Sequence, residues 1–167
     1  IRRILKDPGL RFEMVIVGKQ TNTDIAVAYI KDIVKPGIVE EIKDRLQSIN
    51  TDSILDSGYV EAFIEDSPYS IFSTIGYSER PDVVVGKLLE GRAAIIVDGS
   101  PIALTAPMVF IEQFQTSEDY YIRAYSATYL RFIRLLSYFL TILAPALYVA
   151  ITTFHQELIP TSLLFTM

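Results

Sequence analysis

The sequence predicts an α/β domain with a mixed sheet covered by helices, followed by one long helix that enters a membrane. Short segments rich in Val and Ile alternate with amphipathic segments over about the first 105 residues, and residues 135–154 contain no charged side chain. In addition, 50% of the chain is hydrophobic and its mean hydropathy is +0.32, although 21% of the residues are charged. A positive mean hydropathy at this charge content indicates that the apolar residues are concentrated in one segment.

The domain begins with two predicted strands, residues 12–18 and 24–30, which are separated by the polar turn KQTNT. Pro36 then opens a predicted helix that runs to about Ile49. One face of this helix is apolar, with Ile38, Ile42, Leu46 and Ile49.

A second helix is predicted over residues 58–65. A third covers 81–90, where Pro81 stands at the first helical position and Gly91 follows the end. The apolar runs 93–97 and 101–105 flank Asp98-Gly99, a strong hairpin signal. Nearly continuous apolar strands with helices between them are typical of a sheet covered by helices.

The uncharged segment 135–154 is predicted to be a transmembrane helix, because 20 residues at about 1.5 Å each match a hydrocarbon core of about 30 Å. The alternative is a buried helix in a soluble core, which a chain this short could hardly surround. Three arginines precede the segment, which places the N-terminal portion in the cytosol by the positive-inside rule: Arg123, Arg131 and Arg134.

One helix is predicted to start near Ser117, a plausible N-cap, and to continue without Gly or Pro to Ala144. Four parts are therefore predicted. Residues 1–116 form a cytosolic α/β domain, which is a fragment of a larger N-terminal domain, and residues 117–134 form a juxtamembrane helix. Residues 135–154 form a transmembrane helix, and residues 155–167 form an extracytosolic loop and the start of the next apolar segment. The juxtamembrane tyrosines fit either the lipid headgroup layer or packing on the cytosolic domain: Tyr120, Tyr121, Tyr125 and Tyr129.

The composition excludes several classes of site. The chain has no Cys and one His, so a thiolate site, a multi-histidine metal site and a His-based triad are not expected. A net charge of −5 argues against nonspecific nucleic-acid binding. The chain also lacks a nucleotide-binding glycine loop. We therefore expect no catalytic, cofactor-binding or metal-binding residues, and no enzyme.

The transmembrane segment carries a polar stripe. The members of the stripe fall within about 60° of one another on a helix: Ser137, Thr141, Tyr148, Thr152 and His155. Pro145 lies between them in the sequence and leaves the carbonyl of Thr141 without its helical hydrogen bond. The stripe could line an aqueous path or a gating hinge, or it could mediate ordinary helix packing.

Two groups of charged residues stand out in the domain. Residues at both ends of helix 81–90 are predicted to form a structural ion-pair network: Glu79, Arg80, Asp82 and Arg92. No basic residue lies between Arg45 and Arg80, a stretch with six acidic residues that could dock a partner or a cation, or could be a solvated face: Asp52, Asp56, Glu61, Glu65, Asp66 and Glu79.

The ordered motifs ERPD, EGR, VDGSP, DYY, LRFIR and HQELIPTSLL extend over the second half of the chain, after YIKDIVKPGIVEEIKDRL and YVEAFIED. In this order they resemble the A subunits of spore germinant receptors, the GerA family, or the related stage V sporulation protein of the same family. The approach FSTIGYSERPD has Ser and Thr where the family is more proline-rich, which puts the conformation of this loop in doubt.

The resemblance implies an integral protein of the spore inner membrane that acts with a transporter-like B subunit and a lipoprotein C subunit. It further implies a homo-oligomer in contact with membrane lipid that forms a nutrient-gated cation channel. Nutrient recognition in the family lies in the B subunit, so no ligand-binding residue is assigned here. We expect the helix from Ser117 to act as a rigid rod between domain and membrane. The alternative function is a membrane-anchored scaffold, whose acidic cytosolic face recruits partners without conduction.

Overall fold

The structure is a computed structural model that describes residues 1–67, 69–116, 119 and 121–154. The chain divides into two compact units, Ile1–Phe110 and Ile111–Met167, and each is described separately below. The boundary therefore lies six residues before the end of the predicted domain at residue 116.

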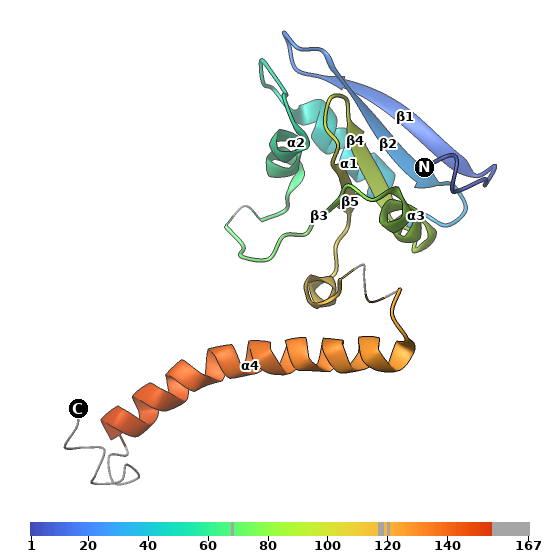
Figure 1. Ribbon diagram of the computed structural model, residues 1–167. Coiled ribbons are helices and arrows are strands. Elements are labelled where there is room, and N and C mark those ends of the chain that lie inside the picture. The colour runs from blue at the N-terminus through green and yellow to red at the C-terminus, as the bar shows by residue number, and fades with distance from the viewer. Residues whose placement is uncertain (68, 117–118, 120, 155–167) are drawn as a thin grey trace. The chain divides into compact units, whose positions relative to one another are not determined.

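The first unit contains a five-stranded sheet in the order β1-β2-β4-β5-β3 (Figure 1). Its strands are β1 (Leu10–Val17), β2 (Thr23–Ile30), β3 (Gly76–Ser78), β4 (Ala93–Val97) and β5 (Ala103–Ala106). The helix-covered sheet is confirmed, but a mixed sheet is not, because every adjacent pair of strands is antiparallel. The mixed sheet was expected because helices between strands often connect parallel strands. In this sheet, neighbouring strands run in opposite directions at every pairing.

Two hairpins supply four of the five strands, and both were predicted. β1 pairs with β2 from Leu10↔Ile30 to Val17↔Thr23, and β4 pairs with β5 across the Asp98-Gly99 turn. β3 was not predicted, because its three residues carry little pattern and are held by pairing with β5 alone.

Helices α1 (Ile38–Ser48) and α2 (Ser57–Ile64) pack on one face of the sheet, and α3 (Pro81–Leu89) packs on the other. All three were predicted to within two residues at each end. The larger core joins α1 and α2 to the sheet, and its fully covered side chains include Ile25, Val27, Leu46, Val60 and Ile95. The smaller core joins Val84 and Leu88 of α3 to Ala28, Ile30 and Ala94.

Polar contacts tie α1 to its surroundings. Glu13 of β1 accepts hydrogen bonds from Tyr29 of β2 and from Lys43 of α1, the latter at 2.6 Å. Arg45 of α1 pairs with Asp66 and Glu41 and donates to the carbonyl of Ile64 at the end of α2. These contacts fix α1 against both the sheet and α2.

The described part of the second unit holds the end of the short 3-10 helix η1 (Phe110–Phe114) and the long helix α4 (Ala124–Phe154). The prediction of a helix that starts near Ser117 is wrong, because Tyr121 and Ile122 form a turn and a bend before α4 begins. Ser117 and Tyr120 lie outside the described residues. α4 continues through Pro145 and includes the whole segment 135–154.

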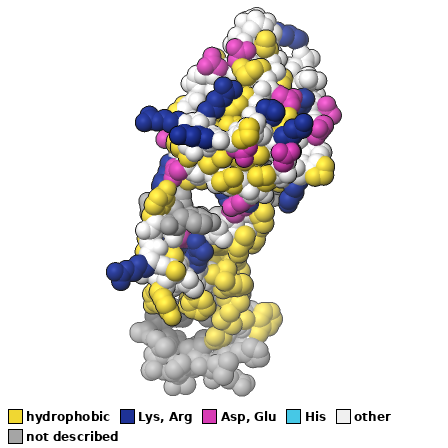
Figure 2. All heavy atoms as spheres, turned by 90° about the vertical axis from the view of Figure 1, so that its right-hand side faces the viewer, with side chains coloured by type: hydrophobic (Ala, Val, Ile, Leu, Met, Phe, Trp, Pro, Cys, Tyr) yellow, Lys and Arg dark blue, Asp and Glu magenta, His cyan; other side chains and the backbone are white. Residues whose placement is uncertain are grey.

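α4 is long and apolar enough to cross a membrane, and its most apolar stretch is not buried. Large hydrophobic side chains are exposed along its length, such as Phe139, Leu143 and Leu147. In the view of Figure 2, the first unit instead carries interspersed basic and acidic side chains. The two units thus have the different surface chemistries that the mean hydropathy of the chain conceals.

Candidate functional site

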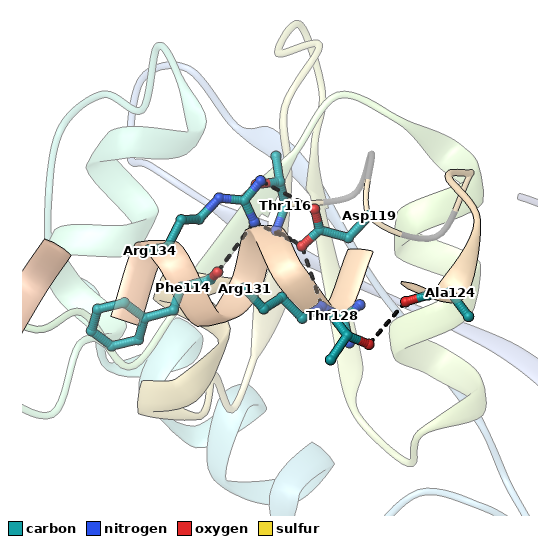
Figure 3. Close-up of polar contacts among 7 residues, drawn as sticks. All are labelled: Phe114, Thr116, Asp119, Ala124, Thr128, Arg131 and Arg134. Atoms are coloured by element: carbon teal, nitrogen blue, oxygen red, sulfur yellow. Dashed lines mark hydrogen bonds and ion pairs between the residues drawn. The ribbon is translucent and has the colours of Figure 1, made fainter. Parts of the chain in front are cut away.

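In the described part of the second unit, Asp119 binds Arg131 and Arg134, which lie in the N-terminal third of α4 (Figure 3). We call these three residues the arginine clasp. Nη1 and Nη2 of Arg134 lie 2.8 and 3.1 Å from Oδ2 and Oδ1 of Asp119. Nε of Arg131 lies 3.3 Å from Oδ2. The Arg134 contact is a fork-to-fork pair, which a guanidinium can form and an ammonium cannot.

The sequence places the two arginines three residues apart on α4, so they occupy adjacent positions on one helix face. Asp119 reaches them because the chain turns between Asp119 and Ala124 and brings the preceding segment back along α4. If the helix had started at Ser117, as predicted, Asp119 would lie about 18 Å along the axis from Arg131. The turn therefore creates the clasp.

Backbone and ring contacts extend the clasp. The carbonyl of Phe114 accepts a hydrogen bond from Nη1 of Arg134 at 3.4 Å, and the Phe114 ring meets Tyr138 edge-on at 5.0 Å. The amide of Thr116 donates to Oδ2 of Asp119 at 3.3 Å. Phe114 and Asp119 are thus joined to α4 over two helical turns.

The Asp119 side chain is fully covered, whereas those of Arg131 and Arg134 are about one-third exposed. The hydrogen bond from Arg134 lowers the pKa of Asp119 to about 2, with help from the Thr116 amide and Arg131, and burial opposes this shift. Asp119 is therefore ionised at neutral pH and compensates part of the arginine charge.

The clasp and the polar stripe lie on the same face of α4. With about 100° per residue, Arg134 and the four described stripe positions Ser137, Thr141, Tyr148 and Thr152 fall within about 60° of one another. Pro145 lies on the same side. The stripe therefore continues the clasp into the apolar part of the helix. His155, the last predicted member, lies outside the described residues.

Two of the four described stripe hydroxyls bond to their own helix. Thr141 Oγ1 donates to the carbonyl of Ser137 at 2.7 Å, and Thr152 Oγ1 donates to that of Tyr148 at 2.8 Å. Pro145 has no N–H, so the carbonyl of Thr141 lacks its usual helical donor. The two threonines and the Thr141 carbonyl consequently offer hydrogen-bond acceptors to a neighbour, whereas the hydroxyls of Ser137 and Tyr148 can also donate.

The predicted ion-pair residues of the first unit lie at the two ends of α3. Arg80 pairs with Asp82 at 2.8 Å at the start of the helix. Arg92, after its end, pairs with Glu90 at 2.9 Å and donates to the carbonyl of Pro107. Glu90 was not predicted as a partner, and Glu79 forms no ion pair with any residue that the structure describes.

The acidic residues between Arg45 and Arg80 are partly used inside the domain. Asp66 pairs with Arg45, and Asp56 accepts a hydrogen bond from Ser100 at 2.5 Å, which lowers the pKa of Asp56. Burial raises the pKa of Glu61, which also accepts a hydrogen bond from Ser73. Among residues 1–67, 69–116, 119 and 121–154, no three His, Asp or Glu side chains gather in a way that could hold a metal ion.

An α/β unit followed by an exposed apolar helix of membrane-spanning length is typical of a membrane-associated protein. The chain belongs to the GerA family, since the model of the Bacillus/Clostridium GerA spore germination protein matches residues 1–167.

Comparison with individual proteins agrees with this assignment. The chain is 54% identical over 164 residues to spore germination protein KA of Bacillus subtilis, which covers 98% of this chain and 30% of that protein. Stage V sporulation protein AF of the same organism is 34% identical over 169 residues, 99% of this chain and 34% of that protein. The chain thus spans about a third of the length of these relatives.

A solved structure is also similar, the crystal structure of the N-terminal domain of the A subunit of the Bacillus megaterium spore germinant receptor GerK3. The match has 52% sequence identity and a TM-score of 0.51, and it covers 65% of this chain and 86% of that one.

Proposed function

We propose that this chain belongs to the A subunit of a spore germinant receptor and takes part in nutrient-triggered germination without being an enzyme. In this proposal residues 1–116 are cytosolic, 117–134 form the juxtamembrane part, 135–154 cross the spore inner membrane, and 155–167 lead to the next segment. The higher identity to protein KA than to stage V protein AF, 54% against 34%, favours a receptor subunit over the paralogue. The arginines before residue 135 support a cytosolic N-terminal portion.

The observation that carries a mechanism is the common face of the clasp and the stripe. Asp119 holds Arg134, and the stripe begins one turn further along α4 at Ser137. Displacement of the segment that carries Asp119 would pull directly on the cytosolic end of this face. Coupling then runs through the clasp and not through the continuous rod that the sequence suggested, because the chain turns before Ala124.

In the proposed channel, several copies of α4 turn the stripe toward a shared path for cations. The hydroxyl protons of Thr141 and Thr152 are directed to the helix backbone, so their oxygens and the Thr141 carbonyl remain available as acceptors. Rings of hydroxyl and carbonyl oxygens suit cations. A transporter-like B subunit and a lipoprotein C subunit are the proposed partners.

The proposal is tested with the double variant Thr141→Val and Thr152→Val, which removes both hydroxyls and nearly keeps the side-chain volume. The matched control is Leu143→Val with Leu147→Val on the opposite face. Each variant is introduced into the full-length subunit in spores that contain its partner subunits, and cation release after nutrient addition is measured. We expect severalfold slower release for the threonine variant alone.

Unchanged release in the threonine variant would exclude the stripe as the path. A second measurement separates the channel from the scaffold alternative: cation flux through vesicles that contain the full-length protein and its partner subunits. Flux supports the channel, whereas its absence in a nutrient-responsive preparation supports a scaffold.

A further inference from the structure

The first turns of α4 expose a row of aromatic side chains. Tyr125 is 94% exposed, Tyr129 65% and Phe132 61%. In contrast, Ala127 between them is only 5% exposed. The helix therefore has one covered side and one bare side before it reaches the uncharged segment.

The bare side lies opposite the clasp. Tyr125, Tyr129 and Phe132 are spaced by four and three residues and share one face, about 180° from Arg134. The same face continues into the membrane segment with exposed leucines at Leu136, Leu143 and Leu147. The aromatic row is thus continuous with the side of α4 that contains no polar residue of the stripe.

The length of α4 places this row at the membrane surface. Its 31 residues extend about 46 Å, compared with about 30 Å for the hydrocarbon core and about 40–45 Å for the whole bilayer. If residues 135–154 fill the core, Phe132 and Tyr129 lie about 4 and 9 Å outside its cytosolic edge. A headgroup layer of about 5–8 Å on each side then contains Phe132, and Tyr129 lies at its outer margin.

The chemistry of the row fits the same place. A tyrosine ring combines an apolar body with a hydroxyl that needs a polar partner, and such residues gather at membrane interfaces. Phe132, which has no polar atom, is the deepest of the three. Arg131 and Arg134 are turned to Asp119 on the other face, so the row itself carries no charge.

We propose that Tyr125, Tyr129 and Phe132 form an interaction surface for phospholipid, with Phe132 among the headgroups next to the acyl chains and Tyr129 and Tyr125 progressively further toward the cytosol. This inference rests on the membrane crossing of α4 in the proposed function. It assigns the two faces of α4 different neighbours: lipid on the aromatic side, and protein or the ion path on the clasp side.

The test uses the absence of Trp from these 167 residues, which makes single-tryptophan variants of this chain site-specific probes. The chain is reconstituted in phosphatidylglycerol and phosphatidylethanolamine vesicles with lipids brominated at shallow or deep acyl positions. Three variants are compared: Tyr129→Trp in the row, Leu143→Trp in the core, and Tyr59→Trp on α2, where the native side chain is 49% exposed.

We expect Tyr129→Trp to be quenched more strongly by shallow than by deep bromines and Leu143→Trp to show the reverse order. Tyr59→Trp should respond to aqueous acrylamide alone. If Leu143→Trp is quenched by lipid and Tyr129→Trp is not, lipid contact at the row is overturned. Acrylamide quenching would then indicate an open surface, and protection from both quenchers would indicate packing against protein. If Leu143→Trp escapes bromine quenching, α4 does not cross the membrane, and this inference is overturned together with the membrane crossing.

Discussion

Arg134 grips both carboxylate oxygens of Asp119, at 2.8 and 3.1 Å, from the opposite side of a turn in the chain. The pair links a residue before α4 to a residue at the edge of the uncharged segment. Because the guanidinium also donates to the carbonyl of Phe114, one side chain connects two residues of the preceding chain to α4.

Replacing Arg134 by Lys should loosen this connection although the charge is retained. An ammonium cannot bind both carboxylate oxygens and the Phe114 carbonyl in the same geometry. We expect hydrogen exchange at the Thr116 and Asp119 amides to accelerate by about tenfold or more, as measured by mass spectrometry on the chain in detergent. Arg123→Lys is the control, since Arg123 lies outside the clasp. Equal protection in Arg134→Lys and wild type would contradict a bidentate clasp.

The clasp should resist acid down to an unusually low pH. The pKa of Asp119 is about 2 in the folded protein, below its ordinary value of 3.8, so the ionised form stabilises the native state. This contribution is complete above about pH 5 and is lost as the pH falls from about 5 to about 2. Exchange at the Thr116 amide, corrected for its intrinsic pH dependence, should rise in this window. In Asp119→Asn the rise should be absent, and its persistence there would assign it to another group.

The larger core should depend on Leu46 of α1, which is fully buried against the sheet and α2. Leu46→Ala leaves a cavity and should reduce the free energy of unfolding of the first unit by about 2–5 kcal/mol. Leu55→Ala is the control, since Leu55 is 67% exposed, and it should change stability by less than about 0.5 kcal/mol. Native-state hydrogen exchange of β4 amides measures both, and a similar loss in the two variants would contradict the packing.

Two glycines close to each other in sequence should respond in opposite directions to alanine. Gly91 has a φ of +86°, and a Cβ there would lie 2.7 Å from the carbonyl oxygen of Ile33, so Gly91→Ala should destabilise by about 1–3 kcal/mol. Gly86 lies inside α3 with open space around it, so Gly86→Ala should stabilise by about 0.5–1 kcal/mol. The change in the free energy of unfolding of each variant is measured by hydrogen exchange of the β4 amides at increasing denaturant concentration. A destabilised Gly86→Ala would mean that α3 is covered by another part of the assembly.

The sequence predicted the elements whose pattern is local. The first hairpin followed from two Val- and Ile-rich runs around a polar turn, and the second from Asp98-Gly99. α3 followed from Pro81 and Gly91 at its two ends. The short strand β3 escaped because pairing with β5, not its own three residues, makes it a strand.

The clasp escaped for a related reason. Asp119 precedes Arg131 and Arg134 by 12 and 15 residues, a separation that suggests no contact within one helix. Only the turn before Ala124 brings the carboxylate back to the two arginines. Ser117 and the acidic residues after it have the sequence pattern of a helix N-terminus, which led to the prediction of an earlier helix start. The polar stripe was visible from spacing alone, but its inward-bonded hydroxyls were not, because several rotamers are compatible with the same sequence.

The inward bonds of Thr141 and Thr152 also bear on biogenesis. A hydroxyl that donates to its own backbone costs less to place in hydrocarbon than one that needs a donor or acceptor from another chain. If α4 crosses the membrane as proposed, it can be inserted during synthesis with both threonine hydroxyls already satisfied. Other helices can then bind along the stripe in a later, separate step. The order of assembly would therefore depend on when the other subunits are made.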